Sequence, residues 1–117
     1  MSFIDSNVKR GSAELAVLSL LERGPLHGYE IAKLIGRETD DVLRFDVASL
    51  YPLLYRMEKN GWLTASWEQS GSSRRRRRYR LTETGRKQLA GLRSQWKSFF
   101  RALKRLGGLG RPAVQEH

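Results

Sequence analysis

Five consecutive arginines, Arg74 to Arg78, form the most chemically distinctive segment of the sequence. Adjacent guanidiniums repel one another unless solvent or phosphates neutralise them, so the run predicts a grip on a phosphate backbone that is independent of base sequence. In a strand, successive side chains point to opposite sides, and only about two or three of them are expected to matter. The two sides would carry Arg74, Arg76 and Arg78 and, opposite them, Arg75 and Arg77. A solvated hairpin and a nuclear-import-type run are the alternatives.

The charge of the chain is divided unevenly along its length. Residues 1–73 carry 8 Lys and Arg against 10 Asp and Glu, whereas residues 74–117 carry 14 against 2. The two parts thus contribute −2 and +12 to a formal net charge of +10. This segregation indicates a polyanionic partner, and nucleic acid is the first candidate. A basic solubilising tail is the alternative.

Several classes of chemistry lack the residues they need. The chain has no cysteine and two histidines, so we expect neither a disulfide framework nor a metal site, and no cofactor. His27 is expected to cap or pack at a helix start, because no carboxylate dyad or nucleophile lies near it in sequence. We therefore do not expect an enzyme. No apolar run reaches about 18–20 residues and the N-terminus lacks the core of a signal peptide, which predicts a soluble cytoplasmic protein with no membrane contact.

The elements that must position the arginines begin with two helices. The segment SAELAVLSLLERG predicts a helix capped by Ser12 and stopped by Gly24-Pro25, after a flexible segment at residues 1–11. Its apolar residues lie on more than one side, as in the central helix of a small bundle. His27-Gly28 opens a second helix, which ends near Asp40-Asp41.

A third helix is predicted to begin between Asp46 and Ser49 and to run to Asn60-Gly61, with a core side of Val47, Leu50, Leu54 and Met57. A start at Ser49 is favoured over one at Asp46, because Pro52 is best tolerated in a first turn. The side chains on its outward side are small or able to form hydrogen bonds, so this side could enter a DNA groove and contact base edges and phosphates. That side carries Ser49, Tyr51, Pro52, Tyr55, Arg56 and Lys59. An ordinary amphipathic helix of a bundle is the alternative.

Residues 62–69 and 75–82 alternate in character across a turn-rich spacer, SGSS, and predict a two-stranded hairpin. Three helices followed by a hairpin is the order of a winged helix-turn-helix, in which the third helix takes the major groove.

A long helix is predicted over residues 83–107, capped by Thr82 and followed by a disordered tail at 108–117. At roughly 36 Å it exceeds what so small a domain needs for its own core. Its apolar residues follow a spacing of 3, 4, 3, 4, 3, which predicts pairing with the same helix of a second copy. This dimer interface comprises Leu89, Leu92, Trp96, Phe99, Leu103 and Leu106.

Trp96 has two interpretations. An indole in a helical seam commonly packs against its symmetry mate. Alternatively, two copies of Trp96, Phe99 and Phe100 could line an aromatic slot for a flat organic effector. The many basic residues of this helix would also suit an anionic effector or an acidic surface.

Three segments together resemble the PadR family of regulators across residues 13–106. They are LLERGPLHGYEI (20–31), SLYPLLYRMEKNGWL (49–63) and RRRRYRLTETGRKQL (75–89). The resemblance implies that Ser49, Tyr51 and the hairpin arginines lie on DNA-contacting segments, and that the single C-terminal helix swaps against a partner. It also places Trp96 where an effector-lining aromatic sits in the smaller PadR subclass. The chain departs from the family in its longer arginine run and in a hairpin spacer without acidic residues.

We therefore expect a mainly α protein with a small β-hairpin: a winged helix domain at 12–82 and a dimerisation helix at 83–107. The expected function is a homodimeric, sequence-specific transcriptional regulator that binds a two-fold symmetric operator on double-stranded DNA. It is expected to act as a repressor relieved by a small effector. A ligand-binding or protein-interaction adaptor and a nonspecific architectural nucleic-acid binder are the alternatives.

Overall fold

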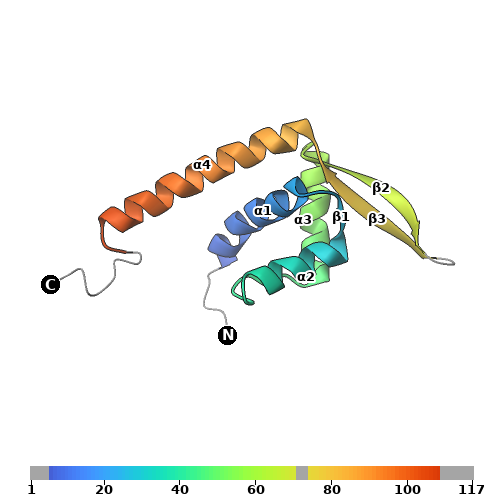
Figure 1. Cartoon of the computed structure of the whole chain (residues 1–117), viewed down its shortest axis with the longest axis horizontal. Helices are drawn as coiled ribbons and strands as arrows, with labels where there is room; N and C mark the ends of the chain where they lie inside the picture. Colours follow the sequence, from blue (N-terminus) through green and yellow to red (C-terminus); the bar gives the residue numbers. More distant parts are fainter. Residues whose placement is uncertain (1–5, 71–73, 109–117) are drawn as a thin grey trace.

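The structure, a computed structural model, describes residues 6–70 and 74–108 and forms four helices and a small sheet (Figure 1). The helices are α1 (Ser6–Glu22), α2 (Gly28–Glu38), α3 (Val47–Lys59) and α4 (Glu83–Arg105). The strands are β1 (Leu26–His27), β2 (Leu63–Ser70) and β3 (Arg74–Leu81). Within the described ranges, none of the helices combines the length and apolar character that a membrane span requires.

The predicted hairpin is confirmed as β2 and β3, which we call the wing. The two strands are antiparallel, and Trp67 lies opposite Arg77 while Glu68 lies opposite Arg76. The short strand β1 was not predicted; it adds to the other edge of β3, giving the order β1-β3-β2. Helices, sheet and connectivity together form the predicted winged helix-turn-helix.

One hydrophobic core joins the helices to the base of the wing. Amphipathic periodicity explains the contribution of each helix, since apolar residues three and four apart fall on one side. α1 is buried on more than one side, as its sequence predicts, and lies between α4 and the other helices (Figure 1). The fully or nearly fully buried side chains include Val17, Leu18, Ile31, Leu50, Leu54, Met57, Leu63, Tyr79 and Leu89.

The start of α1 was predicted too late. The helix begins at Ser6 rather than after a cap at Ser12, so residues 6–11 are helical and not a flexible segment. The early residues continue the helix alongside α4: a Cβ placed on Gly11 would lie 3.7 Å from the indole of Trp96. Packing between helices thus overrides the weak helix propensity of glycine and the local cap signal. Residues 1–5 lie outside the described part.

The predicted start of α3 at Ser49 was also wrong. The helix begins at Val47, and the side chain of Asp46 caps it by accepting a 2.7 Å hydrogen bond from the Ser49 N–H. Pro52 therefore lies inside the helix, and the Ala48 carbonyl loses its usual amide donor. Since Ala48 is exposed, water can satisfy that carbonyl, and the aspartate cap decides the boundary.

Helix α4 begins as predicted. Thr82 caps it by accepting a 2.9 Å hydrogen bond from the Gly85 N–H, and its C-terminus closes over Gly107, which has a φ of 83°. Gly108 still donates to the Leu103 carbonyl, so the helix closure includes the first residue of the predicted tail. The predicted tail from 109 to 117 lies outside the described residues. Beyond α1, the C-terminal half of α4 extends away from the domain (Figure 1).

Candidate nucleic-acid interface

A groove of about 670 Å³ lies between the wing and α3. Of the predicted DNA-contacting residues, Tyr51 and Tyr55 of α3 and Arg75, Arg76 and Arg77 of β3 line it. The groove also contains residues that were not predicted to contact DNA, namely His27, Tyr29, Trp67 and Tyr79. The structure therefore brings the outward side of α3 and the basic strand together on one side of the protomer.

The outward side of α3 is exposed throughout. Tyr51 and Tyr55 are 42% and 59% exposed, and the Lys59 ammonium lies 5.8 Å from the Tyr55 ring centre. The opposite side is buried in the core, with Leu53 in addition to the predicted Leu50, Leu54 and Met57; Val47 is only partly buried. The other exposed residues of the predicted contact set are Ser49, Pro52, Arg56 and Lys59.

Two arginines on one side of β3, Arg75 and Arg77, lie beside an exposed tryptophan. The guanidinium carbons of Arg75 and Arg77 lie 5.0 and 5.4 Å from the Trp67 ring centre, within the range of cation–π attraction. Arg77 also donates a 2.8 Å hydrogen bond to Glu58 of α3. The pair is partly buried, so Arg77 joins the wing to α3 and has less of its guanidinium available for phosphate than Arg75 has.

The other side of β3 carries a second ion pair. Arg78 donates a 2.6 Å hydrogen bond to Glu68, and the other Glu68 oxygen lies 2.8 Å from Nε2 of His27. Arg75 and Arg76 are exposed. The structure thus confirms that alternate arginines face opposite sides, and it leaves Arg75 and Arg76 as the more open cations of the four whose side chains are described. The side chain of Arg74 lies outside that part.

The sequence analysis did not identify several residues that line the groove or pair with the wing arginines: Tyr29, Glu58, Trp67 and Glu68. Alternation along β2 could have placed Trp67 and Glu68 on opposite faces of the hairpin. Alternation could not identify their arginine partners, because the pairing register of two strands cannot be deduced from the sequence of either strand alone. Glu58 lies on α3, and its contact with Arg77 depends on how the wing packs against that helix in the folded protein.

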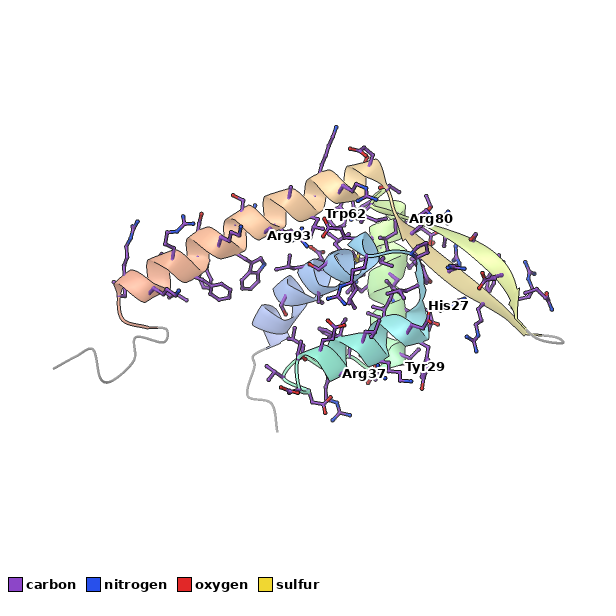
Figure 2. The ribbon with its side chains drawn as sticks, in the orientation of Figure 1. His27, Tyr29, Arg37, Trp62, Arg80 and Arg93 are labelled. Carbon is purple, nitrogen blue, oxygen red and sulfur yellow. The ribbon has the colours of Figure 1, made fainter. Side chains whose placement is uncertain are left out.

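His27 lies where β1 meets α2, next to the wing, and caps α2 together with Glu30 (Figure 2). The predicted structural role of this histidine is confirmed. Contact with the backbone N–H and then the ring of His27 lowers the pKa of the Glu30 carboxyl. The pKa of Glu68 is also lowered, first by the hydrogen bond from Arg78 and then by that from His27. Both carboxylates therefore remain ionised at neutral pH.

A second hollow, of about 410 Å³, lies between α1 and α4 and is lined by Trp96 and Phe99. Phe100 completes an aromatic cluster: its ring centre lies 5.6 Å from that of Trp96 and 6.0 Å from that of Phe99. The three predicted effector-pocket residues are thus neighbours in one protomer. Phe99 and Leu106 remain 53% and 83% exposed.

One residue of the predicted dimer interface was assigned wrongly. Leu89 is only 1% exposed and belongs to the core of its own protomer, because α4 packs on α1 at this level. It has no surface left for a partner. Leu92 packs partly against the same core, so the free apolar side of α4 begins beyond it.

The sequence and the fold agree with a known family. Residues 17–91 match the model described as "Transcriptional regulator PadR-like family". The chain belongs to this family. Membership of the PadR-like family places the chain among transcriptional regulators. Within the described ranges, no group of His, Asp and Glu side chains is arranged to hold a metal ion.

Individual relatives and solved structures cover most of the chain. A transcriptional regulator from Clostridium thermocellum is 32% identical with a TM-score of 0.79, covering 87% of this chain and 96% of that one. The negative transcriptional regulator PadR of Bacillus subtilis is 28% identical over 74 residues, which are 63% of this chain but 41% of that protein. The structure of Bacillus subtilis PadR in complex with operator DNA is similar in fold, with 22% identity and a TM-score of 0.64; the match covers 76% of this chain and 58% of that one.

Proposed function

We propose that this PadR-family regulator binds operator DNA as a homodimer, with α3 in the major groove and the wing on the phosphate backbone. The observation that carries this proposal is the single groove that Tyr51 and Tyr55 share with three wing arginines. Phosphate contacts set affinity, whereas side chains on the outward side of α3 read base edges. The relative solved with operator DNA has the same fold, which supports this mode of binding.

The dimer would form through the free side of α4. Phe99, Phe100 and Leu106 are large apolar side chains exposed on the part of α4 that extends beyond α1, and burying them against a second copy would stabilise both. Two α3 helices related by a two-fold axis would then read half-sites about one helical turn or more apart. The interface would comprise Trp96, Phe99, Phe100, Leu103 and Leu106, with the partly buried Leu92 at its edge.

The roles of the wing and α3 can be separated by mutation. Arg76→Ala is expected to weaken binding to all DNA sequences alike and to reduce the slope of log affinity against log salt by about 1, since one phosphate contact is lost. Arg56→Ala is expected to reduce discrimination between operator and random DNA by about 1–3 kcal/mol. Titrations at several salt concentrations measure both quantities. If the two substitutions change both quantities equally, this division of roles is wrong.

We further propose that the protein is a repressor relieved by a small effector. The name of the Bacillus subtilis relative, a negative regulator, supports repression. The effector would bind at Trp96, Phe99 and Phe100, where exposed rings can stack on a flat molecule and the basic residues of α4 would favour an anionic one.

Tryptophan fluorescence tests the effector proposal. A planar aromatic acid that binds beside Trp96 is expected to quench the emission in a saturable manner and to release operator DNA over the same concentration range. Trp96→Phe should abolish the quenching, whereas Trp67→Phe, which removes the indole of the wing, should preserve it. Quenching that persists in Trp96→Phe would locate the ligand elsewhere.

Two other functions use the same scaffold: an adaptor that has lost operator specificity, and a nonspecific architectural binder. A gel shift with the DNA upstream of the protein's own gene and with random DNA, at two salt concentrations, separates them. A regulator prefers the upstream DNA at both salt concentrations. An architectural binder loses both complexes together as salt rises, and an adaptor binds neither.

A further inference from the structure

His27 contacts a carboxylate with each of its two ring nitrogens. Nδ1 lies 2.9 Å from Oε1 of Glu30, and Nε2 lies 2.8 Å from Oε1 of Glu68. The imidazole is only 15% exposed. Glu30 belongs to α2 and Glu68 to the wing, so the ring joins the helix-turn-helix to the wing (Figure 2). We call these three side chains the His27 bridge.

The geometry sets how many protons the ring needs for both contacts to be hydrogen bonds. An ionised carboxylate only accepts hydrogen bonds, and a neutral imidazole has a single N–H to donate. Both contacts can be hydrogen bonds only when both ring nitrogens are protonated. In a neutral ring, one nitrogen lone pair would face a carboxylate oxygen at less than 3 Å. The His27 bridge is therefore complete only with an imidazolium.

Other charged groups surround the bridge. Arg78 of β3 is bonded to the second oxygen of Glu68, and the charge of Arg76 also acts on Glu30. These two guanidiniums oppose the ring proton, but both ring nitrogens contact carboxylates. α3 contributes Tyr51 and Tyr55, which line the same groove as His27. The groups in direct contact with the two ring nitrogens are thus carboxylates and not guanidiniums.

We infer that His27, as an imidazolium, is a positioning residue for DNA binding: it holds the wing against the helix-turn-helix, and DNA affinity falls when it loses its proton. The inference rests on the proposed function, since it concerns the placement of the wing arginines on DNA. Histidine ordinarily changes its charge between about pH 5 and 8. The bridge therefore requires a protonated ring together with ionised Glu30 and Glu68, and it is lost when the ring gives up its proton.

The test compares DNA affinity at about pH 6 and about pH 8, at constant ionic strength, with the full chain and a labelled random-sequence duplex. Affinity is expected to fall about three- to tenfold at the higher pH, because one partly exposed charged hydrogen bond is lost. Glu68→Gln should remove most of this dependence. Its amide can donate to a neutral Nε2 while its oxygen still accepts from Arg78.

The second histidine supplies a matched control. His117→Gln removes a titrating group of the same kind elsewhere in the chain and should leave the pH dependence of affinity unchanged. If the dependence disappears in His117→Gln and persists in Glu68→Gln, the inference is overturned. Equal wild-type affinity at the two pH values also overturns it.

A measurement without DNA separates this inference from the proposed function. Nitrogen NMR of the imidazole should report two protonated nitrogens at about pH 6, and wing amides should exchange faster at about pH 8 after correction for intrinsic rates. A singly protonated ring at the lower pH, or wing protection that does not change, overturns the inference. If DNA fails to bind at any pH, the proposed function is wrong, and these two DNA-free readouts alone decide whether the His27 bridge exists.

Discussion

Replacing Gly85 by alanine is expected to destabilise the protein by about 3 kcal/mol, among the largest effects of adding one methyl group to this chain. Gly85 is buried in the first turn of α4, where it meets the start of β2. A Cβ at this position would overlap the carbonyl oxygen of Trp62 and lie 2.7 Å from Cδ1 of Leu81. The Trp62 carbonyl already accepts a hydrogen bond from the Thr82 N–H, so it cannot move aside without breaking that bond.

Thermal unfolding at a fixed protein concentration measures this loss of stability. Gly85→Ala should lower the Tm by roughly 10–20 °C. Gly91→Ala is the matched control. It makes the same change in the same helix where a Cβ would meet nothing within 4 Å, so it should raise stability by about 0.5–1 kcal/mol. If both variants shift the Tm in the same direction, the close approach at Gly85 does not govern stability.

Phe99→Asp is expected to produce a monomer and to weaken operator binding at least about 100-fold, because two linked half-site contacts become independent ones. Phe99 is more than half exposed in the protomer, so a charge there is tolerated in the monomer but costly in an apolar interface. Sedimentation measures the oligomeric state and anisotropy the affinity. Circular dichroism should show that the winged helix domain remains folded.

Ser98→Asp controls for the added negative charge. At 100° per residue, Ser98 lies on the opposite side of α4 from Trp96, and its side chain is exposed. This variant should remain a dimer and lose only a small part of its DNA affinity. A monomeric Ser98→Asp, or a dimeric Phe99→Asp, would contradict the proposed interface.

The arginines of the run differ in their partners and in their exposure. A count of charges treats Arg74 to Arg78 as equivalent. In the structure Arg77 is bonded to Glu58 and connects the wing to α3, whereas Arg78 is bonded to Glu68 and joins the two strands of the wing. The cations that remain more open are therefore held in place by the ones that are paired.

Much of the fold followed from local rules in the sequence. The amphipathic periods of α2 and α3, the cap at Thr82 and the alternation of the hairpin depend on residues a few positions apart, so they can be identified without coordinates. The same rules identified the exposed side of α3. They failed at the starts of α1 and α3, where helix packing near Trp96 and a cap at Asp46 outweighed the signals at Ser12 and Pro52.

The helices and strands, their order and the polarity of their surfaces can be inferred from the residues alone, because each depends on short-range backbone preferences and on hydrophobic period. The strand register, the strand β1, the burial of Leu89 and the contacts of His27 with Glu68 and of Glu58 with Arg77 became apparent from the folded chain. The pairing of Leu26 with Tyr79, for example, joins residues 53 positions apart. Such contacts are set by how the whole core packs, since the position of each element depends on all its neighbours.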